Sequence, residues 1–475
     1  MARAPFILLV NPWITDFAAY DLWAKPLGLL LLASLLRQAG CGIVFLDCLN
    51  RYDLPTQKHS AVQPGIERKY GTGKYPKMLI AKPEPYAEIP RNYYRHGIHP
   101  ESFDRQLKSI PKPDLIWVTS IMTYWYPGVQ QTRAKIRENF SDVPIWLGGI
   151  YSRLCSQHAA ANSGASEVVT DPMQRLPDRI EVESGFEIKN KSRWMSLCAA
   201  PTPALDLLPK LSYAPVLTSS GCPFSCPYCA SRVLQPVWQR RRSQDIYAEL
   251  CKWNENFGVQ DFAFYDDALL INAETTLKPA LERICNDGLK LRFHTPNALH
   301  IRALTSEWCE LLHTSGFTTI RLGLETSRVD QQQSWGGKVE TEMFYAALDN
   351  LSAAGFCRSQ IGAYLLCGVP GQTPDDVSAA IDLVRQTGAQ PYLAEYSPVP
   401  GTPMWAEAQS LSSYALADEP LYHNNSFFAC RRPDFSYHDL TVLKELARKA
   451  RCANSMDKKP KATGDLRVQP ATSEG

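Results

Sequence analysis

Short apolar runs alternate with amphipathic stretches over the first 170 residues. Apolar stretches without a polar break predict buried parallel strands, and we expect them at residues 6–10, 42–47, 114–120, 143–147 and 167–169. Helices are expected between them at 27–38 and 129–139, the first beginning after Pro26 and ending before Gly40. This alternation predicts an open, parallel, Rossmann-like α/β sheet, which binds ligands at the carboxyl ends of its strands.

The same alternation returns after residue 213. Its expected strands are residues 214–218, 261–265, 289–293, 319–323, 360–366 and 392–395. Its expected helices are residues 243–256, 274–286, 305–315, 342–354 and 374–387. Six such units predict an open, partial (β/α)6 version of the TIM-type barrel, whose functional residues lie at the carboxyl ends of the strands.

The two series divide the chain into domains. We expect an α/β domain at 1–170 with an insertion at 50–112, a linker at 171–213, the barrel at 214–408, a C-terminal extension at 409–455 and a disordered tail at 456–475. The extension contains one expected helix, at 438–452.

Composition narrows the class of protein only slightly. The chain has 475 residues, of which 45% are hydrophobic and 21% charged, and its net charge is +2, as is ordinary for a globular protein. Its longest leucine-rich run is shorter than the roughly 20 residues that span a bilayer, and no signal-peptide pattern precedes the first strand. We therefore expect a cytoplasmic protein without a membrane segment.

Three cysteines lie close together just after the first barrel strand. Cys222, Cys226 and Cys229 have the spacing C-x3-C-x2-C, and Pro223 and Pro227 restrict the loop between them. Such a loop can close around one metal centre. Structural zinc takes four ligands, and a four-iron cluster ordinarily takes four thiolates, so a fourth donor is missing locally. An iron without a protein ligand can bind a substrate or a cofactor.

With Gly221 before the first cysteine and Tyr228 before the last, the loop resembles the signature loop of radical S-adenosylmethionine (radical SAM) enzymes. The resemblance implies that the three cysteines hold a [4Fe-4S] cluster and that SAM chelates its fourth iron. One electron, from a donor such as flavodoxin or ferredoxin, then cleaves SAM to methionine and a 5′-deoxyadenosyl radical. By chance this cysteine pattern would occur in roughly one such sequence in a hundred.

Polar residues and glycines follow the expected barrel strands. They are Asp266, Asp267, His294, Asn297, Glu325, Gly368 and Tyr396. The resemblance implies that Glu325 binds the ribose or the amino group of SAM and that the backbone at Gly368 approaches adenine. Asp266 and Asp267 are candidate cofactor contacts, although they could equally cap the following helix. A structural role for His294 is as plausible as contact with substrate.

The N-terminal domain resembles the cobalamin (B12)-binding domain of a large subclass of the same family. The matching residues are Pro26 at the start of the first helix, Ser120 after the third strand, and Gly148 and Gly149 after the fourth. The histidine loop that binds cobalt is absent, because residues 11–16 read Asn-Pro-Trp-Ile-Thr-Asp. Cobalamin is therefore a possible third cofactor, and the alternative is a domain that only covers the barrel.

The insertion at 50–112 interleaves aromatic and basic residues, among them Lys69, Tyr70, Lys74 and Tyr75. Such a segment can cover an active site, form plain surface or contact nucleic acid, and we favour the cover because long insertions in compact domains are often lids. Without a recognisable RNA-binding module, nucleic acid is unlikely and a small-molecule substrate is preferred.

The sequence thus predicts a radical SAM enzyme with an unidentified substrate. If cobalamin binds, methyl transfer to carbon is the leading outcome, and otherwise another radical reaction is. The main alternative is a non-catalytic zinc module completed by a remote cysteine or histidine, and a further one is a cluster-binding protein without activity.

Overall fold

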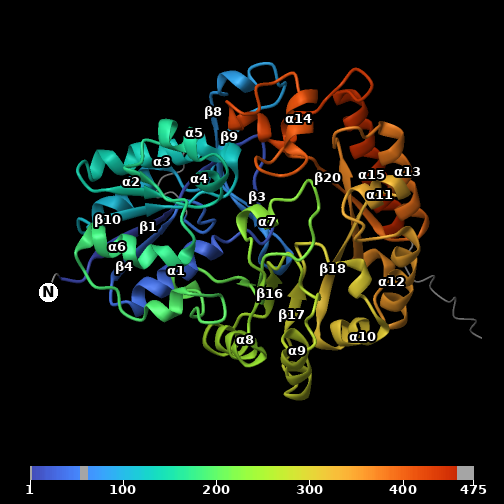
Figure 1. Ribbon diagram of the computed structural model, residues 1–475, viewed down its shortest axis with the longest axis horizontal. Coiled ribbons are helices and arrows are strands. Elements are labelled where there is room, and N and C mark those ends of the chain that lie inside the picture. The colour runs from blue at the N-terminus through green and yellow to red at the C-terminus, as the bar shows by residue number, and fades with distance from the viewer. Residues whose placement is uncertain (1–2, 54–61, 457–475) are drawn as a thin grey trace, which may run out of the picture.

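A computed structural model describes residues 3–53 and 62–456 of the chain. The expected tail lies outside the described residues except for its first position. Figure 1 shows two α/β lobes side by side, the N-terminal one in blue and cyan and the second in green to orange, with the last part of the chain bridging their upper rims.

The N-terminal lobe contains a five-stranded parallel sheet, as the sequence predicts. Its strands are β1 (Phe6–Asn11), β4 (Gly42–Asp47), β10 (Leu115–Val118), β11 (Ile145–Leu147) and β12 (Glu167–Val168), in the order β12-β11-β10-β1-β4. Alternate residues of β1 face opposite ways. Ile7 and Leu9 pack with α1 (Leu27–Gln38), whereas Leu8 and Val10 pack with α3 (Tyr126–Asn139) on the other face.

The insertion is built mainly from short antiparallel strands. Its described elements include β5 (Val62–Gln63), β6 (Ile66–Glu67), β7 (Gly73–Lys74), β8 (Lys77–Ile80), β9 (Tyr93–His96) and α2 (Pro100–Ser109). Two short strands that follow β1, β2 (Ile14–Asp16) and β3 (Tyr20–Asp21), complete two small sheets with the strands of the insertion. Their orders are β2-β9-β8-β5 and β3-β7-β6. The insertion is thereby fixed above the carboxyl edge of the main sheet.

The segment expected to be a linker packs against the N-terminal domain. It contains α6 (Leu176–Ser184), and Leu176, Ile180 and Trp194 belong to the same buried cluster as α1. Three apolar side chains among scattered prolines gave no periodicity in the sequence, so this packing was not predicted.

The second lobe is the expected partial barrel. Its parallel strands run in order from β13 (Ala214–Val216) through β16 (Asp261–Phe264), β17 (Arg292–His294), β18 (Phe317–Glu325) and β19 (Ile361–Cys367) to β20 (Gln390–Glu395). The covering helices include α8 (Ser243–Phe257), α9 (Leu277–Asn286), α10 (Ser306–Ser315), α12 (Thr341–Ala353) and α13 (Pro374–Gln386). The fold class predicted from the sequence is confirmed.

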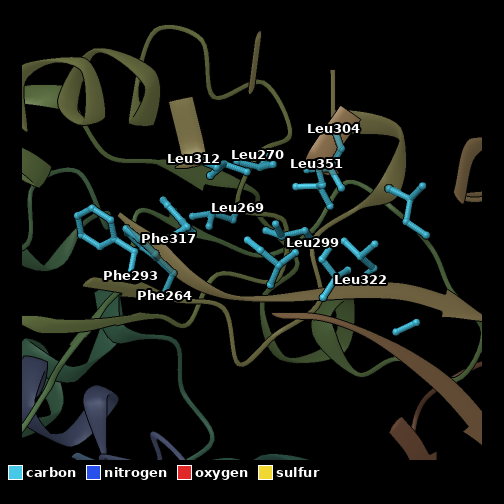
Figure 2. Packing of buried hydrophobic residues seen from close by; sticks show 14 of the residues in the cluster. Phe264, Leu269, Leu270, Phe293, Leu299, Leu304, Leu312, Phe317, Leu322 and Leu351 are labelled. Carbon is cyan, nitrogen blue, oxygen red and sulfur yellow. The ribbon is translucent and has the colours of Figure 1, made fainter. Parts of the chain in front are cut away.

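The two faces of the barrel strands differ sharply. Phe264, Phe293 and Leu322 point outward and pack with Leu312 and other helix residues, as Figure 2 shows. The alternating residues of the same strands, which include Asp261, His294 and Arg321, point to the inside of the barrel, where a substrate can be held.

The C-terminal extension joins the two lobes. Helix α15 (Tyr437–Met456) packs on α13 and β20, and residues ahead of it contact the N-terminal domain. There Thr123 lies 3.0 Å from His423 Nδ1, and Asn424 donates to Asp16 at 3.1 Å. Within the described part of the chain no helix combines the length and hydropathy needed to cross a bilayer.

Candidate active site

The cysteine loop lies at the carboxyl end of β13. It connects β14 (Ser219–Ser220) to α7 (Ser231–Leu234), and the amide of Cys229 donates to the carbonyl of Cys226 at 3.1 Å. Gly221 has φ 80°, and a side chain there would approach the Gln235 carbonyl to 2.9 Å, so the turn into the loop requires glycine. All three thiols are free and half-buried.

The ligand set of a single metal ion is not assembled at this loop. Among the described residues no three His, Cys, Asp or Glu side chains are close enough together to hold one ion. The nearest extra donor is His300 Nε2, 3.9 Å from Cys222 Sγ, and burial lowers the pKa of this imidazole to about 4. This geometry does not favour the zinc module, whereas a four-iron cluster spreads its thiolates over separate irons.

Burial also controls the protonation of the loop. It raises the pKa of Cys222 to about 11 and raises that of Cys226, which the nearby Lys338 ammonium opposes. The thiols of Cys222 and Cys226 in the metal-free loop therefore carry protons at neutral pH, and metal binding must release them.

A buried ion pair lies beside the loop. Lys338 Nζ is 2.7 Å from Glu325 Oε1, and each side chain is only 12% exposed. Glu325 follows a register shift at the end of β18 and has φ 68°, a conformation that is strained for a residue with a side chain and is typical of functional sites. Burial lowers the pKa of Lys338, but Glu325 and Cys226 outweigh this and hold it above its ordinary value.

Tyr228 completes this group. Lys338 Nζ lies 5.7 Å from the centre of its ring, and the edge of Trp335 faces it. The Tyr228 hydroxyl is buried without a nitrogen or oxygen partner, and its hydrogen bond to the Cys226 thiol is a weak one. The sequence analysis named Tyr228 and Glu325 as candidates but not Lys338, for which the preceding Gly336-Gly337 pair was the available signal.

The two aspartates after β16 differ in environment. Asp266 is buried and accepts hydrogen bonds from the backbone and hydroxyl of Thr218 and from Ser219, at 2.6 to 3.0 Å. These bonds tie the end of β13 to β16 and occupy the carboxylate within the fold. Asp267 is closer to the cysteine loop, and burial raises its pKa although Ser231 hydrogen-bonds to it.

The remaining barrel candidates contact other parts of the protein. Gly368 has φ 83°, and a side chain there would meet the Phe428 ring at 2.5 Å, so this bare backbone accommodates the C-terminal extension. His294 bonds to Asp261 at 3.0 Å and lies against both Trp23 and Tyr70. Tyr70 thus brings the insertion onto the inside of the barrel. The buried hydroxyl of Tyr396 has no partner among the described residues.

Asn297 donates to the backbone carbonyl of Tyr265 at 2.9 Å, directly beside the two aspartates. This bond holds the segment after β17 against the segment after β16. The Asn297 side chain thus stabilises the loops at the carboxyl ends of these two strands.

In the N-terminal domain the three predicted cobalamin contacts lie together. The Ser120 hydroxyl donates to the Gly148 carbonyl at 2.7 Å, and Gly149 has φ 99° with its Cβ position 2.1 Å from the Ser120 carbonyl. Asn11, the last residue of β1, donates a hydrogen bond to Asp47 at 2.7 Å. On the small sheet above this edge Thr15 Oγ1 and His96 Nδ1 are buried without partners, which fits a ligand rich in amides.

A family model agrees with this geometry. Residues 216–384 match the model of the Radical SAM superfamily. This stretch, about a third of the chain, is therefore similar to the Radical SAM superfamily. The [4Fe-4S] cluster and SAM are the cofactors of these proteins, and the three free thiols on one loop and the Glu325–Lys338 pair beside it fit them.

Curated relatives match the chain in part. It is 25% identical over 236 residues to an uncharacterized methyltransferase of Pyrococcus horikoshii, which covers 47% of this chain and 48% of that protein. It is 27% identical over 209 residues to a tRNA-2-methylthio-N(6)-dimethylallyladenosine synthase of Corynebacterium efficiens, covering 40% and 38%. The chain thus spans less than half the length of these curated relatives.

One solved structure is similar in fold to almost the whole of this chain. It is the radical SAM methyltransferase TsrM of Kitasatospora setae with cobalamin and a [4Fe-4S] cluster bound, with a TM-score of 0.65, 15% identity, and 95% and 100% of the two chains covered. A second TsrM structure, with tryptophan and the SAM analogue aza-SAM, has a TM-score of 0.62 at 15% identity and covers 86% and 78%. At this identity the likeness establishes a shared two-domain fold.

Proposed function

We propose that this protein is a radical SAM methyltransferase that acts on a small molecule and binds cobalamin in its N-terminal domain. The observation that carries the proposal is the buried Glu325–Lys338 pair beside the three-cysteine loop. When bound, the cluster and SAM supply a one-electron cleavage of a carbon–sulfur bond that starts radical chemistry on an unactivated carbon.

The residues of the barrel mouth have complementary tasks. Cys222, Cys226 and Cys229 hold the cluster. Glu325 can accept a hydrogen bond from the amino group of SAM, and Lys338 can donate one to its carboxylate.

Contacts of Tyr70, in the insertion, and of Trp23 support a role for this part of the chain as a cover. Trp23 donates to the Tyr70 carbonyl at 3.2 Å, and both rings lie against His294 on the inner face of the barrel. A reactive radical requires a site from which water and stray donors are excluded, and these aromatic side chains exclude solvent from that side.

Two further elements of the proposal are that the reaction is a methyl transfer and that cobalamin is bound. They are supported by the shared fold of TsrM, by the methyltransferase name of the Pyrococcus relative, and by the arrangement of Ser120, Gly148 and Gly149. A small substrate is supported by the tryptophan bound to TsrM. An electron donor such as flavodoxin or ferredoxin would have to reduce the cluster.

The test is anaerobic reconstitution with iron, sulfide and cobalamin, followed by gel filtration. Corrin absorbance that elutes with the chain, together with SAM-derived 5′-deoxyadenosine or S-adenosylhomocysteine after reduction, supports the proposal. Bound zinc in place of iron would contradict the proposal that the protein is a radical SAM enzyme. Iron without retained corrin would contradict the cobalamin part alone.

A further inference from the structure

Arg321 on β18 differs from two other cations of the barrel, Arg292 on β17 and Lys338 in the connection after β18. Arg292 is paired with Asp261 at 2.6 Å, and Lys338 with Glu325. For Arg321 no carboxylate of the described residues lies within ion-pair distance; its guanidinium donates to the neighbouring Ile320 carbonyl and lies 4.6 Å from the centre of the Tyr392 ring. An arginine inside a barrel without a counter-ion is available to an anion.

A glycine creates the space around this arginine. Arg321, Gly362 and Gln390 are register partners across β18, β19 and β20, so they point to the same face. A Cβ atom at Gly362 would approach Arg321 Cδ and Tyr392 Cε2 to 2.8 Å each. The bare backbone of Gly362 therefore lets the side chains from the flanking strands meet over β19.

Gln390 supplies the second observation. Its side-chain amide nitrogen is buried, with the residue only 4% exposed, and has no hydrogen-bond partner. A buried N–H group without an acceptor destabilises the fold unless something binds it. Tyr392 and Tyr364, on the same inner face, remain partly exposed, so this face can be reached from outside.

We propose that Arg321 and Gln390 form an anion site that holds a carboxylate or phosphate group of the substrate. A guanidinium and an amide N–H₂ are both donors, and together they match an oxyanion. Arg321 precedes Glu325 by four residues on one strand, which is about 13 Å at 3.3 Å per residue. An anchored molecule on the order of 10 Å long would thus reach from the anion site to the barrel mouth. Because the mouth carries the proposed cluster, the role as a substrate anchor rests on the proposed function.

Phenylglyoxal labelling of the full-length chain tests the site without any cofactor. Labelling is followed at each arginine by peptide mass spectrometry, with inorganic phosphate or acetate added at constant ionic strength. With phosphate at ten times its dissociation constant, the labelling rate of Arg321 should fall about tenfold, because about one site in eleven remains free. Arg385, on the outer helix α13, is the internal control and should be unchanged.

The two anions separate the two substrate chemistries. Protection by phosphate alone assigns a phosphate group, and protection by acetate alone assigns a carboxylate. If neither anion protects Arg321 more than Arg385, the anion site is refuted.

The Gln390→Leu variant provides a test that keeps Arg321 in place. It removes a buried unpartnered donor and should fold at least as stably as the parent chain. Arg321 should still be labelled, but protection should require about tenfold more anion, the change expected for one lost hydrogen bond to a charged group. Unaltered protection in this variant would contradict the assignment of Gln390.

Failure of the site can be told apart from failure of the proposed function. If anions protect Arg321 but the reconstituted protein does not cleave SAM, the anion site is supported and the proposed enzymatic function is contradicted. If the protein cleaves SAM but anions do not protect Arg321, the function is supported and the anion site is contradicted.

Discussion

The ammonium group of Lys338 lies 2.7 Å from the carboxylate of Glu325, and the two side chains are almost equally buried at the mouth of the barrel. One of them ends a strand in a left-handed conformation, and the other follows a glycine pair in the next connection. Their pairing brings two separate segments of the chain together beside the cysteine loop.

Replacing Lys338 by methionine should destabilise the cofactor-free protein by about 3 kcal/mol, because the Glu325 carboxylate is left buried without its partner. Thermal unfolding at pH 7 measures this. Lys444→Met is the matched control, since its pair with Glu395 is more exposed and should contribute about 0–1 kcal/mol. Equal losses in the two variants would contradict the role of the buried pair.

Glu325→Gln should keep the fold but weaken SAM binding to the reconstituted protein by about tenfold, the effect of losing one charge-assisted hydrogen bond. Equilibrium dialysis with labelled SAM measures the affinity. If the variant binds SAM as tightly as the parent chain, the proposal that Glu325 contacts SAM is contradicted.

Asp266 should behave as a structural residue. Asp266→Ala leaves buried groups of Thr218 and Ser219 without their acceptor, and should cost about 3 kcal/mol of unfolding free energy. Asp267→Ala should cost clearly less in the same denaturant titration. A larger loss of unfolding free energy for Asp267→Ala than for Asp266→Ala would contradict the structural role of Asp266.

His423 should make the docking of the C-terminal extension sensitive to acid. Burial lowers the pKa of this imidazole to about 4, from 6.5 in the unfolded chain. The unfolded state then binds more protons between these values, so stability is complete above pH 6.5 and is lost as pH falls towards 4. The loss from this residue is about 3 kcal/mol. His423→Gln should flatten the dependence of unfolding free energy on pH in that window, and an unchanged slope would contradict the assignment.

Gly149→Ala should destabilise the N-terminal domain by about 3 kcal/mol or more, because the new Cβ atom would meet the Ser120 carbonyl and the left-handed φ disfavours a side chain. Gly28→Ala is the control, since nothing lies within 4 Å of that position in α1. Urea unfolding compares the two. A stable Gly149→Ala protein would show that this loop adapts without cost.

The sequence predicted the elements well where apolar runs were long and well bounded. Helix α1 has the predicted limits because Pro26 and Gly40 flank it, and the strands of both sheets fall within a few residues of their predicted ranges. The cysteine loop could be recognised because its three cysteines are close together in the sequence.

Contacts between distant segments could not be predicted in this way. The partner of Glu325 is Lys338, and Gly368 faces Phe428, sixty residues later in the chain. Asp266 looked like a cofactor contact because it ends a strand, and only the fold reveals the donors around it. The roles given to Asp267, Gly368, Ser120 and Gly148 remain predictions.

The most direct test of the account is the iron and acid-labile sulfide content of anaerobically reconstituted protein, measured with the 5′-deoxyadenosine formed from SAM after reduction. We predict close to four irons and four sulfides per chain together with 5′-deoxyadenosine, and neither in a chain with Cys222, Cys226 and Cys229 all replaced by alanine. Equal iron and equal product in the parent and triple-alanine chains would contradict the claim that these three cysteines hold the catalytic cluster.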